Sequence, residues 1–209
     1  MKIINFIEKL LYKLRLTNGY YQYDKNGNVI EFKSSFFDSW KATYNKYDSI
    51  LMKEYASGKW DKYIYDENDN QIFYENSKGY WCKAAYNTFN KQTYSQDSNG
   101  FIEYLTYDKN GNLIFLSNSN DLYYKYTYNE NNKCILYENS DGERHEYTYD
   151  EKGRQTSCKT ENGSWWEKTY DELGRELSSK DETGFHEEYR YDEKGKLYIT
   201  CLTQKDDRK

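Results

Sequence analysis

Polar and apolar residues alternate in short runs along most of the chain, and turn-forming residues separate these runs. Alternation of this kind predicts half-buried β-strands. The runs recur with a constant period of 21 residues, and each period contains a tyrosine followed by Asp or Asn. These tyrosines are Tyr23, Tyr44, Tyr65, Tyr86, Tyr107, Tyr128, Tyr149, Tyr170 and Tyr191. Nine copies in phase, with no insertion or deletion, indicate a tandem repeat.

Two columns of turn residues divide the repeats into strands. The first column lies four residues after each repeat tyrosine and holds only Gly, Asn or Asp, which tolerate positive φ angles at low cost. Its members are Gly27, Asp48, Asp69, Asn90, Gly111, Asn132, Gly153, Gly174 and Gly195. The second column is Gly58, Gly79, Gly100, Asp121, Gly142, Gly163 and Gly184. Asn-Gly pairs such as Asn99-Gly100 predict type I′ hairpin turns, which need positive φ at two successive residues.

The repeat therefore predicts an all-β fold, a repetitive antiparallel β-hairpin meander that forms an open curved or superhelical sheet. We expect about eight repeats over residues 20–198 and a C-terminal strand or tail over residues 199–209. Residues 1–19 are predicted to hold a capping helix, because Ile3, Ile7 and Leu10 recur at helical spacing. Such a helix would cover the open end of the sheet. It could instead bind a membrane surface, a partner protein or a second copy of the chain.

Alternation along each strand assigns the two faces of the sheet. The repeat tyrosine and the mostly apolar residue two positions before it predict the packed face, where the tyrosines form a structural ladder whose hydroxyls need partners. The adjacent Asp or Asn, or a turn backbone group, could supply that partner.

The opposite face carries the residues one, three and five positions before each tyrosine. It is the candidate partner-binding face, and the column three positions before the tyrosine changes from Lys to Glu along the chain. Its candidate residues are Trp60, Lys62, Trp81, Lys83, Tyr123, Lys125, Glu146, Trp165, Glu167 and Glu188. Two structural interpretations also fit these residues: cross-strand aromatic pairs that stiffen the sheet, or burial of this face by curling of the sheet.

The composition agrees with this architecture. The chain has 26 tyrosines and no proline, which would remove ladder hydrogen bonds from the strands. Aromatic residues make up 19% of the chain, which argues against disorder. Hydrophobic residues make up only 36%, which argues against the aliphatic core of a large α/β enzyme. No long apolar run is present, so no membrane-spanning helix is expected.

The net charge of -5 arises in the last third of the chain, where residues 141–209 hold 13 basic and 18 acidic side chains. An acidic protein is a poor non-specific binder of DNA. This part of the chain could instead meet a basic partner, or it could be an ordinary solvated surface.

Recognisable catalytic chemistry is absent from the sequence. The four cysteines are Cys82, Cys134, Cys158 and Cys201, and none forms a C-x-x-C pair. Free thiols and the lack of a signal-peptide cleavage site favour the cytoplasm of the producing or host bacterium. His145 and His186 are predicted on opposite faces, so they make a poor dyad or metal pair. We therefore expect no enzyme activity, no cofactor and no metal.

The last repeats carry a resemblance to a known family. They read YDEKGRQTSCKTENGSWWEKT, YDELGRELSSKDETGFHEEYR and YDEKGKLY. This pattern resembles the YD repeat of the Rhs and Tc-toxin C families, whose units read Y-D-x-x-G-R-L with a later Gly turn. Asn45, Asn87 and Asn129 replace the Asp in earlier copies. The resemblance implies a spiral β-sheet that can surround a toxic cargo, although eight repeats are too few to close such a shell.

These observations favour a protein-binding repeat scaffold, which could act as an inhibitor or modulator of a bacterial protein. A second hypothesis is a phage or mobile-element inhibitor of a defence nuclease, of the anti-CRISPR kind, that acts sterically or by acidic charge mimicry. A third is a carbohydrate-binding module that uses Trp60, Trp81, Tyr123 and Trp165, and a fourth is an Rhs toxin-related fragment. The expected partner is a protein, with carbohydrate or single-stranded nucleic acid as less favoured ligands and no role for a membrane.

Overall fold

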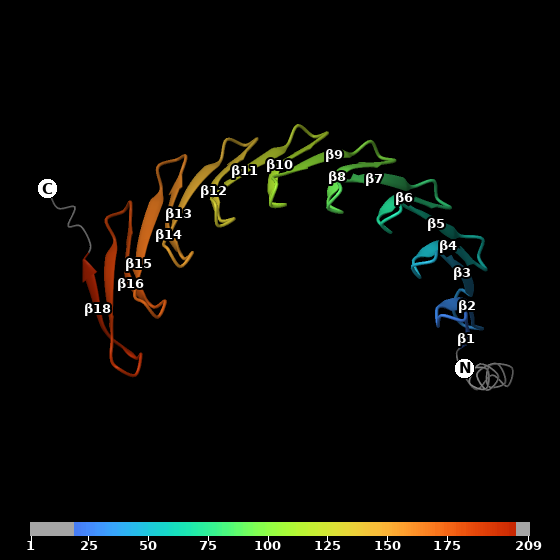
Figure 1. The fold of residues 1–209 in the computed structure, drawn as a ribbon, viewed down its shortest axis with the longest axis horizontal. Helices are drawn as coiled ribbons and strands as arrows, with labels where there is room; N and C mark the ends of the chain where they lie inside the picture. The colour runs from blue at the N-terminus through green and yellow to red at the C-terminus, as the bar shows by residue number, and fades with distance from the viewer. Residues whose placement is uncertain (1–18, 204–209) are drawn as a thin grey trace. The chain divides into compact units, whose positions relative to one another are not determined.

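The computed structural model describes the backbone of residues 19–203 and the side chains of residues 19–197, and within these bounds the chain forms eighteen β-strands and no helix. Figure 1 shows the strands in chain order. Most strands have six residues, as the period predicts. The strands are β1 Tyr20–Tyr23, β2 Val29–Lys33, β3 Trp40–Tyr44, β4 Ile50–Tyr55, β5 Trp60–Tyr65, β6 Gln71–Asn76, β7 Trp81–Tyr86, β8 Gln92–Asp97, β9 Ile102–Tyr107, β10 Leu113–Asn118, β11 Tyr123–Tyr128, β12 Cys134–Asn139, β13 Arg144–Tyr149, β14 Gln155–Thr160, β15 Trp165–Tyr170, β16 Glu176–Asp181, β17 His186–Tyr191 and β18 Leu197–Thr203.

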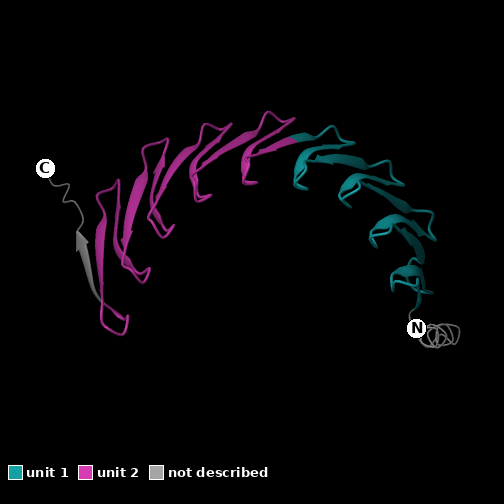
Figure 2. Ribbon diagram, viewed as in Figure 1, with its two compact units in different colours: residues 1–103 teal, residues 104–209 magenta. Residues whose placement is uncertain are grey.

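The chain divides into two units, residues 1–103 and residues 104–209, which are coloured separately in Figure 2. In unit 1, β1 to β8 pair antiparallel, each with its neighbours in sequence. In unit 2, β10 to β18 pair in the same way. The predicted all-β hairpin meander is therefore confirmed. The capping helix predicted for residues 1–19 lies almost wholly outside the described residues.

Asp and Asn side chains organise the turns after the repeat tyrosines. The Asp66 carboxylate accepts hydrogen bonds from the backbone N–H groups of Asn68 and Asn70, both at 2.9 Å. Asp69, three residues after Asp66, then takes a φ of 64°. The pairing register shifts between Ile64 and Tyr65, so a bulge accompanies the turn. An Asn can replace the Asp because its side-chain oxygen accepts the same bonds, which explains the alternation of the two residue types.

Positive φ angles occur at all nine positions of the first predicted turn column and all seven of the second. However, the predicted type I′ turn is wrong. Gly100 has a φ of 87° while Asn99 has no positive φ, and the Gly100 N–H donates to the Asp97 carbonyl at 3.1 Å. This is the pattern of a three-residue loop, a type I turn followed by one left-handed residue. Asp97 stabilises it by accepting the N–H groups of Asn99 and Phe101.

The repeat tyrosines join successive repeats. The Tyr65 hydroxyl donates to the Ile50 carbonyl at 3.0 Å, and the Tyr149 hydroxyl donates to the Cys134 carbonyl at 2.8 Å. The same bond to the carbonyl fifteen residues earlier is made by Tyr44, Tyr86, Tyr128, Tyr170 and Tyr191. The acceptor is the first residue of the strand after the preceding turn, whereas the adjacent Asp or Asn serves the turn itself.

The described side chains include few that are buried. The buried ones are Tyr20, Ala42, Cys158 and Asn139, and no large side chain among the described residues is completely enclosed. The repeat tyrosines are half-buried instead. The stability of each unit therefore comes mainly from contacts between neighbouring hairpins rather than from a central core.

Candidate binding site on the open face

The face opposite the repeat tyrosines, here called the open face, consists of the strand residues one, three and five positions before each tyrosine and their cross-strand partners. The side chains three positions before the tyrosine are exposed at Lys62, Lys83, Lys125, Glu167 and Glu188, and Glu146 is half-buried. In unit 1 this face carries the predicted residues Trp60, Lys62, Trp81 and Lys83. In unit 2 it carries Tyr123, Lys125, Glu146, Trp165, Glu167 and Glu188.

The strand that follows the turn after each repeat tyrosine is here called a return strand. In unit 1 the return strand β6 adds an aromatic residue that the sequence interpretation missed. Phe73 lies directly opposite Lys83 on one side and Ile64 on the other. Its ring stacks on Trp81 with a centroid distance of 6.5 Å. Ile64 is 40% exposed. These side chains form an apolar area on the open face of unit 1.

The signal for this area is a column eight residues after each repeat tyrosine, on the return strands. Its members in the second to eighth repeats are Met52, Phe73, Tyr94, Phe115, Leu136, Ser157 and Ser178. The side chain at this position is large and apolar or aromatic in the first five of these repeats, and it is small and polar in the last two. It could have been found by examining the period on the return strands as well as on the strands that lead to the tyrosine.

Two lysines border the apolar area of unit 1. Lys62 lies opposite Glu75 in the pairing register, but among the described residues neither Lys62 nor Lys83 forms an ion pair with a carboxylate. Lys83 Nζ lies 5.8 Å from the ring centroids of both Trp81 and Tyr94. Cation–π attraction of this kind holds the ammonium group near the rings while leaving its hydrogen-bond donors available.

In unit 2 the charged residues of the open face form ion pairs both across strands and along a strand. Lys125 contacts Glu138 at 3.3 Å, and Arg144 contacts both Glu138, at 3.5 Å, and Glu146. Tyr123, which is 40% exposed, stacks on Phe115 with a centroid distance of 6.3 Å. The aromatic residue here therefore has a cross-strand partner, as the structural interpretation of these residues expects.

The carboxylates of the later repeats also lie beside nitrogen-bearing side chains. Glu167 contacts Lys180 at 2.7 Å, and Glu188 lies 3.6 Å from His186. The described strands of unit 2 carry five basic and four acidic residues on the open face. These are Lys125, Arg144, Lys159, Lys180 and Arg190, and Glu138, Glu146, Glu167 and Glu188. Basic residues on the return strands thus offset the negative charge that the change from Lys to Glu introduces, and no acidic stripe results on the described strands of unit 2.

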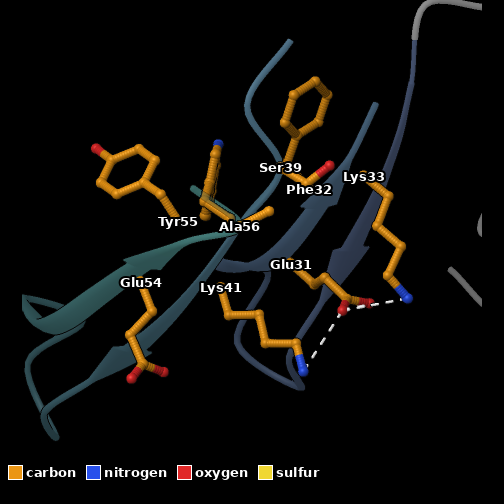
Figure 3. Close-up of a pocket in the computed structure, with 9 residues that line it drawn as sticks. Glu31, Phe32, Lys33, Ser39, Lys41, Glu54, Tyr55 and Ala56 are labelled. Atoms are coloured by element: carbon orange, nitrogen blue, oxygen red, sulfur yellow. Dashed lines mark ion pairs between the residues drawn. The ribbon is translucent and has the colours of Figure 1, made fainter. Parts of the chain in front are cut away.

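A small hollow of about 240 Å³ lies in unit 1 beside β2, β3 and β4 (Figure 3). Glu31 lines it and forms ion pairs with Lys33 at 3.3 Å and Lys41 at 3.8 Å. Phe32 and Tyr55 contribute its apolar part. With Glu54 also in the lining, the acidic and basic side chains are equal in number, so the hollow favours neither an anion nor a cation.

The described residues hold no group of three or more His, Cys, Asp or Glu side chains that could bind a metal ion. His145 lies on the tyrosine face, 3.2 Å from the Tyr147 hydroxyl, and His186 lies on the open face. Burial raises the pKa of the thiols of Cys82, Cys134 and Cys158. Within residues 19–203, no helix has the length and apolar character needed to cross a membrane.

No family model and no curated protein matches the chain. Solved structures do: a crystal structure of TcdB2–TccC3–Cdc42 aligns with a TM-score of 0.59 at 14% identity, over 90% of this chain but only 13% of that one. A crystal structure of TcdB2–TccC3 aligns with a TM-score of 0.41 at 13% identity, over 93% of this chain and 17% of that one. A porin-like protein from Bacteroides uniformis gives a TM-score of 0.34 at 9% identity, over 88% and 90% of the two chains. The first match supports an Rhs- or YD-like repeat fold.

Proposed function

We propose that the chain is a non-enzymatic repeat scaffold that binds another protein through the open face of unit 1. The observation that carries this proposal is the apolar area around Phe73 and Trp81, bordered by Lys62 and Lys83, neither of which forms an ion pair in the described part of the chain. Exposed apolar areas with a polar border are typical of interaction sites. Trp and other aromatic residues also contribute most to binding energy in protein interfaces.

The two lysines indicate the chemistry of the partner. Lys62 and Lys83 lie on β5 and β7, two strands apart, which corresponds to about 10 Å across a sheet. Lys62 faces Glu75 across the strands, whereas Lys83 faces Phe73 and Gln96, so a partner carboxylate would pair with Lys83 while apolar side chains of the partner would contact Phe73.

Affinity purification of the full chain from the cells that produce it, followed by mass spectrometry, identifies candidate partners. The decisive step is calorimetry with the purified partner and the double variant Phe73→Ala/Trp81→Ala. We expect this variant to lose at least about tenfold in affinity, because two aromatic contacts are removed. Leu173→Ala is the control, since Leu173 is 80% exposed in a turn of unit 2. Unchanged affinity of the double variant would overturn the proposal, and an activity assay of the partner would test inhibition.

A further inference from the structure

Unit 2 contains a larger hollow of about 790 Å³, lined mostly by open-face residues and also by Asp150, Arg154, Lys168 and Tyr170. Its floor includes one residue from each of five successive strands, β13 to β17, which are directly opposite one another in the pairing register. These residues, the polar row, are Thr148, Ser157, Glu167, Lys180 and His186. Because neighbouring strands lie about 4.8 Å apart, the row extends over about 19 Å.

Two serines create this hollow. Ser157 and Ser178 line it and occupy the return-strand column that holds Met52, Phe73, Tyr94, Phe115 and Leu136 in the earlier repeats. A side chain of that size at Ser178 would project over the floor of the hollow. The hollow is thus a property of the last two complete repeats, not of the repeat in general.

Hydroxyl groups form much of the lining. The Thr148 hydroxyl lies 2.7 Å from the Ser157 hydroxyl, and the Thr169 hydroxyl lies 2.6 Å from that of Ser178. Each hydroxyl can both donate and accept a hydrogen bond. The lining therefore suits a ligand that is itself rich in hydroxyl groups.

The charged side chains of the row balance each other. Glu167 and Lys180 form an ion pair at 2.7 Å, with side chains that are 51% and 48% exposed. Their outer lone pairs and N–H groups remain accessible from the hollow, but their charges cancel. The other charged residues of the lining are paired too: Arg154 contacts Asp150 at 2.6 Å, and Lys168 contacts Glu176 at 2.9 Å. Since each carboxylate and each Lys or Arg of the lining already has an ion-pair partner, the hollow favours an uncharged ligand.

An aromatic ring stands beside the row. Trp165 lines a neighbouring hollow of about 670 Å³ that shares Lys180 and His186 with the first one. Lys180 Nζ lies 5.7 Å from the Trp165 ring centroid. A few polar groups arranged around an aromatic surface are the usual composition of a small-ligand site. Aromatic rings pack against the C–H face of a sugar ring.

From these features we infer that the polar row and Trp165 bind a neutral oligosaccharide, with successive sugar rings over successive strands. The length of the row corresponds to a few sugar units. This site is separate from the protein-binding area proposed for unit 1, so the two can be tested independently.

The test uses the full chain on a printed array of neutral and anionic glycans, followed by calorimetry with the strongest neutral ligand. We expect binding to a neutral glycan, and a loss of at least about tenfold in affinity for both Trp165→Ala and Ser178→Leu. Ser178→Leu is informative because Leu136 occupies the same column in an earlier repeat of unit 2, so the variant should fold and only fill the hollow. Circular dichroism and the melting temperature check that it does.

Trp60→Ala is the matched control, because it removes the same residue type from the open face of unit 1 and should leave glycan affinity unchanged. Three results would overturn the inference: a blank array, binding confined to anionic glycans, or neutral-glycan affinity that survives Ser178→Leu. Conversely, loss of glycan binding in Ser178→Leu with unchanged capture of a protein partner would support the oligosaccharide site and leave the proposed protein-binding function standing.

Discussion

Replacement of Tyr149 by Phe tests whether the tyrosine hydroxyls hold successive repeats together. The change removes the 2.8 Å hydrogen bond to the Cys134 carbonyl and keeps the aromatic ring. A protein hydrogen bond contributes about 0.5–1.5 kcal/mol net. Tyr149 is half-buried, and burial raises the pKa of its hydroxyl, so water replaces the lost bond only in part. We therefore expect the free energy of unfolding to fall by about 1 kcal/mol.

Urea denaturation followed by tryptophan fluorescence measures this change. With a slope of about 1–3 kcal/mol per molar urea, the midpoint should fall by about 0.3–1 M while the slope stays constant. Tyr123→Phe is the matched control, because the Tyr123 ring stacks on Phe115 from the open face and is not part of the repeat ladder. Its midpoint should stay close to that of the parent. Equal midpoints for Tyr149→Phe and Tyr123→Phe would refute the role assigned to the ladder hydroxyls.

Three further predictions concern the turns and the thiols. Side-chain hydrogen bonds from Asn70 and Asn112 lower the pKa of Asp66 and of Asp108, so the stabilising effect of these carboxylates is complete above the ordinary carboxyl pKa and is lost as the pH falls below about 4. The double variant Asp66→Asn/Asp108→Asn should therefore lose less stability between about pH 5 and pH 2. An acid-unfolding profile identical to that of the parent would contradict this. Gly142→Ala should cost about 1–2 kcal/mol in urea denaturation because the φ of Gly142 is 83°, and a neutral substitution would show that this φ is not required. Burial raises the pKa of Cys134 and Cys158, so iodoacetamide at about pH 8 should alkylate both thiols more slowly in the folded chain than in urea. Peptide mapping measures the two rates, and equal rates would show that the fold does not protect these thiols.

Much of the fold could be predicted because its determinants are local. Each turn depends on one residue that tolerates positive φ and one Asp or Asn that accepts nearby N–H groups, as at Asp66 and Asp69. Both occur at fixed sequence separations, so the period alone locates the strands. The type I′ error arose because an Asn-Gly pair is compatible with two loop types, and the bonds to the Asp97 side chain select the other one.

The binding face was harder to predict because it depends on contacts between strands. The bulge beside each repeat tyrosine shifts the register, and only the pairing pattern shows that Phe73 lies opposite Lys83 or that Lys180 lies opposite Glu167. The sequence interpretation followed the strands that lead to each tyrosine and omitted the return strands. It therefore overestimated the charge of the open face in unit 2 and did not include Phe73 or Ser178.

The spacing of the tyrosine bond also has a consequence for how the length of such a chain can change. If residues 128–148 were deleted, Tyr149 would follow Thr127 directly and would stand fifteen residues after Leu113, whose carbonyl is the present acceptor for Tyr128. The ladder bond would re-form without any other adjustment. A gene encoding this protein can therefore gain or lose whole 21-residue segments by recombination between repeats, whereas an insertion of one residue within a strand would turn the following side chains to the opposite face.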